Sequence, residues 1–358
     1  MATLKDLPTV LLIEILSRLP TESLLRFKSV CKFWYALIND PINFSFQDKC
    51  IFIKRRVMVN FQHFTYIPSI IKFSLAPDRS MSILDVNNPF SYTAFFVICG
   101  HSHGLVCLSF NRDIFLFNMT TEKFHKLPLS ILHYPGDIYD IDFSSTNAVG
   151  FGYDSKSRDF KVVRVVEFGS QYGETNLPAR VEIYDLRKKK WREIESAVCG
   201  RVTRAPTPQM HHKGTYYWWA YKEGRTNIIH TFDMSEEVFG EISVPNDVVN
   251  ERMEYISMGT LNGSIIIFHY SKTGNEKTFD VWEMEKDVVL WSKLMTIGPV
   301  FGVEKPLLFV NSDELLMEAN EGRVISYNIK THVTKVLPIK GLPCVFVDTY
   351  LDYSLVQY

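Results

Sequence analysis

The sequence lacks several features that would assign it to a common class of protein. Charge interrupts its apolar runs well short of the roughly 20 residues that a membrane-spanning helix needs. Asp6 and Glu14 break the pattern of a secretory signal at the start. An excess of one charge is also lacking, because 39 Lys and Arg face 40 Asp and Glu, so we expect no binding to nucleic acid or membrane. We expect an intracellular, soluble protein of the cytoplasm, with a nuclear pool left open.

Cysteine is scarce and follows no common disulfide or metal-binding pattern. The six cysteines are scattered without a Cys-x-x-Cys pair, as is typical of reduced thiols in the cytosol: Cys31, Cys50, Cys99, Cys107, Cys199 and Cys344. The most metal-like group is Cys99, His101, His103 and Cys107. An extended strand would spread its ends by about 26 Å, whereas zinc needs four converging ligands. We interpret this group as structural and expect no metal and no cofactor.

Catalytic motifs are lacking as well. The chain has no Gly-x-Ser-x-Gly elbow, no phosphate-binding glycine loop and no clear pairing of Cys with His. Acidic residues gather in two places, which we interpret as solvated loops: Asp137, Asp140 and Asp142, and Glu283, Glu285 and Asp287. Because two carboxylates at a set separation can hydrolyse glycans, a propeller-type enzyme acting on glycans stays an alternative. The sequence favours a protein that is not an enzyme.

What the chain does contain begins with residues 1–40, a segment with more apolar surface than a short helix can bury. Between residues 10 and 19 only three residues are polar, so apolar side chains cover both faces of the predicted helix. Pro8 suits a first helical turn and Pro20 ends the helix, which predicts about three short helices. A unit of about 40 residues rarely holds itself together. These helices either bind a partner or pack on the rest of the chain.

The residues of this segment resemble the F-box motif. The matching runs are Leu-Pro at 7–8, Ile-Leu-Ser-Arg-Leu-Pro at 15–20 and Ser-Leu-Leu-Arg-Phe-Lys-Ser-Val-Cys-Lys-Phe-Trp at 23–34. Thr9 and Val10 depart from the family, which usually has an acidic residue there. The resemblance implies docking on a Skp-type adaptor, which links the chain indirectly to the cullin and RING subunits of a ubiquitin ligase. The adaptor-binding residues that it implies are Leu7, Pro8, Leu12, Ile15, Leu16, Leu19, Pro20, Leu24, Leu25, Val30 and Trp34.

After a connector at 41–50, residues 51–358 carry a β-rich repeat. An aromatic residue, a polar residue and an apolar residue recur every 45 to 67 positions: Phe117-Asn118-Met119, Tyr184-Asp185-Leu186, Phe232-Asp233-Met234, Trp282-Glu283-Met284 and Tyr327-Asn328-Ile329. Asp or Asn at the end of a strand bonds its own backbone and starts a turn. Repeats of this length are typical of propeller blades. Counting a weaker copy at 73–75, we predict about six blades, with residues 345–347 completing the first. A two-sheet sandwich is the alternative.

Two runs inside the repeats have a structural interpretation. In the run Tyr-Tyr-Trp-Trp, strand alternation sends Tyr216 and Trp218 to one face and Tyr217 and Trp219 to the other. We expect both faces to be buried between blades, in preference to an aromatic platform for a ligand. The only basic cluster, Arg-Lys-Lys-Lys at 187–190, is predicted to be a solvated hairpin turn and not a nuclear signal.

The repeat domain resembles the F-box-associated domain of plant F-box proteins. The likeness is carried by Gly-Leu-Val-Cys-Leu at 104–108, Gly-Phe-Gly-Tyr-Asp at 150–154, Asp-Phe-Lys-Val-Val-Arg at 159–164 and Val-Glu-Ile-Tyr-Asp at 181–185. Within that family the chain is most similar to the S-locus F-box proteins. This resemblance implies a receptor that binds non-self S-RNase in the self-incompatibility of pollen and directs its ubiquitination. A receptor of the same build for another pathway is the alternative.

The predicted fold class is therefore α+β, a small three-helix F-box at 1–40 followed by an all-β, propeller-like domain. The expected function is that of a substrate receptor of an SCF-type ubiquitin ligase, with the chemistry carried out by other subunits. Substrate contacts are expected in the loops that vary most from the repeat, because loops commonly carry recognition. These loops are 133–147, 168–179, 201–213 and 245–256.

Overall fold

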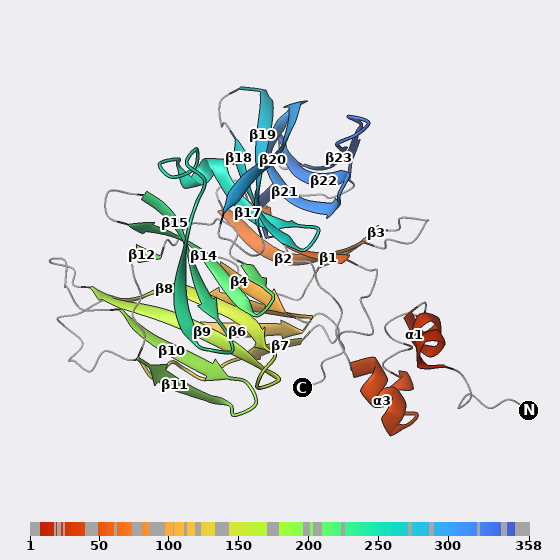
Figure 1. The fold of residues 1–358 in the computed structure, drawn as a ribbon, viewed down its shortest axis with the longest axis vertical. Helices are drawn as coiled ribbons and strands as arrows, with labels where there is room; N and C mark the ends of the chain where they lie inside the picture. The colour runs from red at the N-terminus through yellow and green to blue at the C-terminus, as the bar shows by residue number, and fades with distance from the viewer. Residues whose placement is uncertain are drawn as a thin grey trace, which may run out of the picture.

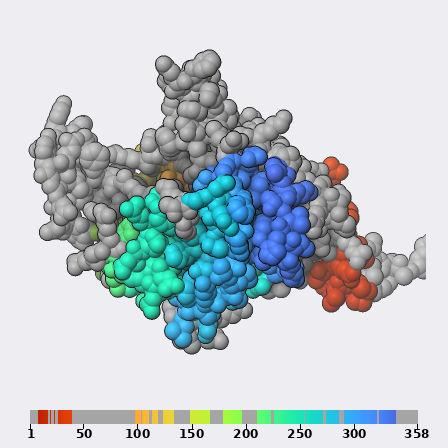
Figure 2. Space-filling view, turned by 90° about the horizontal axis from the view of Figure 1, so that it is seen from above, coloured from red at the N-terminus to blue at the C-terminus, as the bar shows by residue number. Residues whose placement is uncertain are grey.

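The computed structural model contains a helical unit and a large β domain (Figure 1). The residues that it describes are 8–17, 19, 23, 26–39, 49–60, 63–73, 81–85, 97–102, 104–110, 113–118, 123–132, 143–169, 179–195, 201–202, 210–222, 226–270, 274–285, 290–320, 323–337 and 342–347. Helices α1 (Thr9–Ser17) and α3 (Lys32–Asn39) lie at one side of the molecule, in red in Figure 2. No helix in the described part is both long and apolar enough for a membrane span.

The strands form six antiparallel sheets within the described residues. The first sheet contains β25 with β1, β2 and β3 (Leu342–Val347, Lys49–Asn60, His63–Phe73, Met81–Asp85), and the second contains β4 to β7 (Val97–Ser102, Leu105–Phe110, Asp113–Asn118, Lys123–Lys126). The third contains β8 to β11 (Phe143–Asp154, Asp159–Gly169, Arg180–Asp185, Lys190–Ile194), and the fourth contains β12 to β16 (Arg201–Val202, Met210–His212, Thr215–Lys222, Thr226–Asp233, Val238–Ser243). The fifth contains β17 to β20 (Ile256–Leu261, Ser264–Tyr270, Glu276–Met284, Trp291–Phe301), and the sixth contains β21 to β24 (Val303–Asn311, Glu314–Ala319, Val324–Asn328, Thr334–Val336). This all-β arrangement confirms the predicted repeat and excludes two packed sheets.

The repeated triplet marks the third strand of a sheet. Its five copies lie at the ends of β6, β10, β15, β19 and β23. The carboxylate of Asp233 accepts hydrogen bonds from the backbone N–H groups of Ser235 and Glu236, both at 2.8 Å. The amide oxygen of Asn328 accepts from Lys330 and Thr331 in the same way. The predicted turn-starting role is confirmed at these two positions, because the polar side chain satisfies turn N–H groups that no strand can reach.

In the described core, side chains of one sheet are buried against those of the next sheet, and the aromatic run shows how. Tyr216 and Trp218 pack with Phe232 against valines of β9 and β10, whereas Tyr217 and Trp219 pack against the isoleucines of β17 and β18. Both faces of β14 are therefore core, as the alternation predicted. The O–H of Tyr216 donates a 2.7 Å hydrogen bond to the carbonyl of Cys99 on β4. One side chain thus connects three successive sheets.

Glycine makes this close packing possible. At Gly150 on β8, an added Cβ would lie 2.6 Å from a ring carbon of Trp218 and 2.9 Å from one of Tyr216. At Gly152, a Cβ would lie 2.3 Å from the imidazole of His211. These strand positions lack a side chain because an aromatic ring of the next sheet occupies that space.

A buried ionic network joins the third and fourth sheets. The ammonium of Lys161 lies 2.7 Å from carboxylates of both Asp154 and Glu237. Glu237 also pairs with the guanidinium of Arg192, which lies 2.9 Å from Asp185. Burial alone would raise the pKa of Asp154, but hydrogen bonds from Lys161 and two serines outweigh it and hold that pKa far below its ordinary value.

The last strand closes the domain onto the first. β25 pairs antiparallel with β1, with Phe52 opposite Val347 and Lys54 opposite Val345. The prediction that residues 345–347 complete the first blade is confirmed. The first strand begins at Lys49, so the last two residues of the predicted connector belong to the β domain. This pairing joins the last described strand of the domain to its first and covers the edge of β1.

We expect Gly150→Ala to lower the free energy of unfolding by about 1–3 kcal/mol, because the new methyl group overlaps two buried rings. Chemical denaturation of the full chain measures this change. Gly240→Ala is the control, because the close neighbour of its added Cβ is the rotatable hydroxyl of Thr231. Equal stability of the two variants would contradict the proposed packing.

We expect Lys161→Met to cost about 3–5 kcal/mol, because it leaves the buried carboxylate of Asp154 without its cation. Lys156→Met, which breaks an exposed pair with Glu236, is expected to change the free energy of unfolding far less, because solvent screens that pair. Because the folded pKa of Asp154 is depressed, its contribution is full above pH of about 4 and is lost on further acidification. Unfolding curves from neutral to acidic pH should therefore show the wild-type advantage shrinking, and a constant difference would contradict the assignment.

Candidate functional site

The helical unit has a small core of its own. Leu12 and Leu16 of α1 are 3% and 1% exposed and pack against Leu37 and Ile38 of α3. Phe27 and Trp34 add an edge-to-face ring contact, with centroids 5.2 Å apart. Within the described residues, all members of this cluster belong to the helical segment, so this core is formed by the helices themselves.

Apolar side chains also cover the outside of this unit. Six large ones are between 46% and 75% exposed: Val10, Leu11, Ile15, Val30, Phe33 and Tyr35. Burying one such side chain contributes roughly 1.5–3 kcal/mol, so a protein that covers several of them gains a substantial share of a binding energy. Clustered exposure on so small a unit indicates an interaction surface.

The structure divides the eleven predicted adaptor-binding residues. Ile15 and Val30 are exposed, as is Pro8, whereas Leu12 and Leu16 lie inside the helical unit. Leu19 and Trp34 are partly buried against that same core. Leu7, Pro20, Leu24 and Leu25 lie outside the described residues.

Sequence reasoning missed four members of the exposed set: Val10, Leu11, Phe33 and Tyr35. For Val10 and Leu11 the available signal was the apolar character of both faces of α1. That pattern predicts that both faces of the helix are buried, but it does not predict which face is buried within the helical unit and which is left for a partner.

The β domain has two different ends. At one end the first strand of each sheet turns into the second through a short hairpin, such as 155–158 or 262–263. β1 is the second strand of its sheet, so the chain enters from the helical unit at this turn end. Three of the predicted recognition loops, 133–147, 168–179 and 245–256, connect strands at the opposite end.

All four predicted loops are in part strand. Residues 143–147 belong to β8, residues 168–169 to β9 and residue 256 to β17, and 201–213 includes β12 and β13. The prediction was wrong there because pairing with a neighbouring strand extends β structure into sequence without clear alternation. Residues 133–142, 170–178 and 203–209 lie outside the described part.

The segment 245–256 is the predicted loop that the structure describes most fully, and it is held firmly. The amide N–H groups of Asn227 donate 2.7 Å hydrogen bonds to the carbonyls of Val248 and Glu251. Val248 is fully buried. Asp247 and Arg252 are exposed on this frame. A rigid loop that presents charged side chains suits recognition, because little order is lost on binding.

The groups considered for chemistry do not converge in the described residues. Cys99 and Cys107 lie on adjacent strands and are buried, and no cluster of three potential metal ligands occurs in this part of the chain. Burial raises the pKa of the Cys107 thiol, so it is a poor nucleophile. Glu285 is exposed and Glu283 half-buried. His103, Asp137, Asp140, Asp142 and Asp287 lie outside the described residues.

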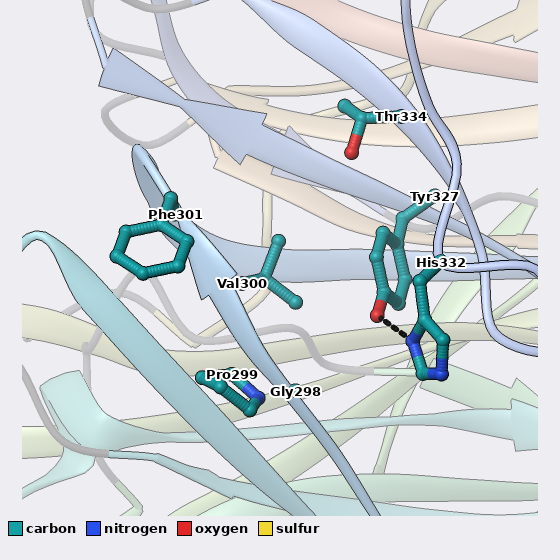
Figure 3. Close-up of a pocket in the computed structure, with 7 residues that line it drawn as sticks. All are labelled: Gly298, Pro299, Val300, Phe301, Tyr327, His332 and Thr334. Atoms are coloured by element: carbon teal, nitrogen blue, oxygen red, sulfur yellow. Dashed lines mark hydrogen bonds between the residues drawn. The ribbon is translucent and has the colours of Figure 1, made fainter.

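A pocket of about 520 Å³ lies between β20 and the outer strands of the next sheet (Figure 3). Tyr327 and His332 form one wall, with the tyrosine oxygen 2.7 Å from Nδ1 of the imidazole, and Phe301 and Pro299 form another. Its lining has no carboxylate and no thiol beside the histidine. Its polar groups are therefore the Tyr327–His332 pair and the hydroxyl of Thr334.

Comparison with known proteins matches two regions of the chain to two family models. Residues 4–46 match the model of the F-box domain, and residues 57–342 match that of the F-box associated beta propeller domain. The F-box protein CPR1 of Arabidopsis thaliana is 27% identical over 98% of this chain and 88% of its own length. The F-box/kelch-repeat protein At3g23880 of the same plant is 27% identical, over 90% and 88%.

A likeness in fold alone extends further. The crystal structure of TolB from Acinetobacter baumannii superimposes with a TM-score of 0.50 at 10% identity, over 85% of this chain and 66% of that one. At this identity the likeness concerns the fold alone.

We expect Ile15→Glu or Phe33→Glu to reduce capture of a purified Skp-type adaptor by at least roughly tenfold, because each puts a charge into an apolar contact. Both residues are at least half exposed, so the full chain should stay folded. Val238→Glu makes the same change at an equally exposed position of the β domain and should leave capture unchanged. Capture that survives both helix changes would contradict the assignment of this face. Leu16→Ala is expected to act differently, by loosening the helices at a cost of about 2–5 kcal/mol.

Proposed function

Because the chain belongs to the family of F-box proteins with an F-box associated β-propeller domain, we propose that it is a substrate receptor of an SCF-type ubiquitin ligase and not itself an enzyme. The observation that carries this proposal is the two-sided helical unit. It buries one apolar face in its own core and leaves six large apolar side chains exposed for a Skp-type adaptor.

The proposed mechanism is proximity. The helices attach the chain to the ligase, and the β domain holds a target so that its lysines stay near the ubiquitin carrier. Transfer of ubiquitin from the carrier to a lysine of the bound target then proceeds as if within one molecule. This proximity raises the rate of transfer without any catalytic group on this chain. We propose that the receptor acts in the cytoplasm, a compartment that keeps thiols reduced, which agrees with the free thiols of Cys31, Cys99 and Cys107.

The geometry of the domain supports binding of the target at the loop end. The chain enters the domain at the turn end, and the predicted recognition loops connect strands at the other. A target held there does not compete with the adaptor for space. The rigid segment 245–256 is the described part of this surface.

For the target, we propose a non-self S-RNase on the strength of the residue resemblance to S-locus F-box proteins. The alternative target is a protein of another pathway, bound by the same loops. Both receptors share the adaptor contact, so adaptor capture does not discriminate between them.

We expect the full chain, bound to its adaptor, to bind at least one member of a panel of purified S-RNases. Asp247→Lys and Arg252→Glu should then weaken that binding by roughly tenfold each, because both reverse an exposed charge on a rigid loop. Lys293→Glu, on the outer strand β20, is the control for a change of charge alone. Surface plasmon resonance measures the affinities. No binding to any S-RNase, with adaptor capture intact, would exclude this target and favour the alternative pathway.

A further inference from the structure

The basic run of the sequence forms, as predicted, a tight hairpin turn. Residues 186–189 join β10 to β11, and the N–H of Lys189 donates to the carbonyl of Leu186 at 3.2 Å. The turn 155–158, between β8 and β9, lies directly beside it. The guanidinium of Arg187 donates a 2.7 Å hydrogen bond to the carbonyl of Arg158. Two turns of one sheet are thus fastened together at the turn end of the domain.

We propose that these paired turns are a docking surface for an acidic segment of another protein. The surface, which we name the cationic turn surface, consists of Arg158, Arg187, Lys188, Lys189 and Lys190. All five are exposed. This proposal does not depend on the identity of the target, because it concerns the end of the domain away from the recognition loops.

Local carboxylates leave most of this positive charge unpaired. Asp159 accepts hydrogen bonds from the backbone N–H groups of Phe160 and Arg187, at 2.8 and 3.0 Å. Lys188 approaches Asp185 only to 3.7 Å, and that carboxylate also pairs with Arg192. In the described part of the chain, the other four cations of the surface form no ion pair. A chain of net charge −1 therefore carries a concentrated positive patch at one place.

Backbone conformation adds an independent argument. Arg158 and Lys189 have φ values of 53° and 51°, in the left-handed region where glycine or asparagine is least strained. Each turn thus keeps a long cationic side chain at a position where a less strained residue would serve the fold better. Positions where the residue present is not the one that the backbone conformation favours are positions where a functional role is expected.

The chemistry of the surface favours an acidic polypeptide over other polyanions. Nucleic acid without sequence preference is bound along a groove with aromatic rings for stacking. Here the cations project from two turns, and Tyr153 nearby is half-buried with its ring edge-on to Phe160 at 5.1 Å. A membrane surface would need apolar side chains to insert, and residues 155–158 and 187–190 include none. Lysine ammonium groups on flexible stems adapt to irregularly spaced carboxylates.

The test uses a short fluorescein-labelled polyglutamate peptide and the full chain. Fluorescence anisotropy should show binding that weakens steadily with added salt. The double variant Arg158→Asn/Lys189→Asn removes two charges and places at both positions a residue suited to the left-handed conformation. We expect it to bind the peptide roughly 5- to 10-fold more weakly, with a thermal midpoint no lower than that of the wild type.

Two matched controls separate charge from turn effects. His332→Asn changes a third left-handed residue, at φ 58°, without removing a lysine or arginine. Lys335→Asn removes one exposed lysine elsewhere on the domain. Both should bind the peptide as the wild type does. The proposal is overturned if the double variant binds normally, or if Lys335→Asn weakens binding as much. It is also overturned if single-stranded RNA or phosphatidylserine vesicles, but not the peptide, bind through these turns.

Discussion

The whole β domain depends on the fact that no sheet can bury both of its faces alone. The described core divides into clusters shared by successive sheets, with aromatic rings of one sheet set against valine, isoleucine or glycine of the next. Tyr216 is the clearest case, because its ring fills the space over Gly150 and its hydroxyl reaches the carbonyl of Cys99 one sheet further on. Stability is therefore a property of the ring of sheets, and the pairing of β25 with β1 matters because it joins the two ends of that ring.

The helical unit meets the same constraint with a different result. It is too small to cover all its apolar surface, so Leu12 and Leu16 are buried within it while Ile15 and Phe33 stay exposed. The apolar faces of the sheets are buried against neighbouring sheets of the same chain, whereas the helices keep an exposed apolar face that another protein can bury. The interaction surface and the core thus have one origin, a segment with more apolar area than its own fold can bury.

Particular residues show which predictions local sequence supports. Asp233 and Asn328 were predicted as turn formers, and they are, because a short polar side chain bonds to N–H groups only two or three residues away. The alternation of 216–219 placed two rings on each face because the period of a strand is local. By contrast, residues 201–213 were predicted as a loop and include β12 and β13, whose pairing with β14 has no signature in their own sequence.

By itself the sequence determined the division into helices and repeated sheets, the turn after each repeated triplet and the membership of the family, since turn chemistry, periodicity and motif spacing are properties of adjacent residues. Only the tertiary structure decided which face of α1 is core and which is exposed, because burial depends on side chains that arrive from α3. It also decided that Arg158 lies beside the lysine turn, although 29 residues separate it from Arg187 along the chain. Contacts between distant residues follow from the path of the whole chain, and no local pattern encodes them.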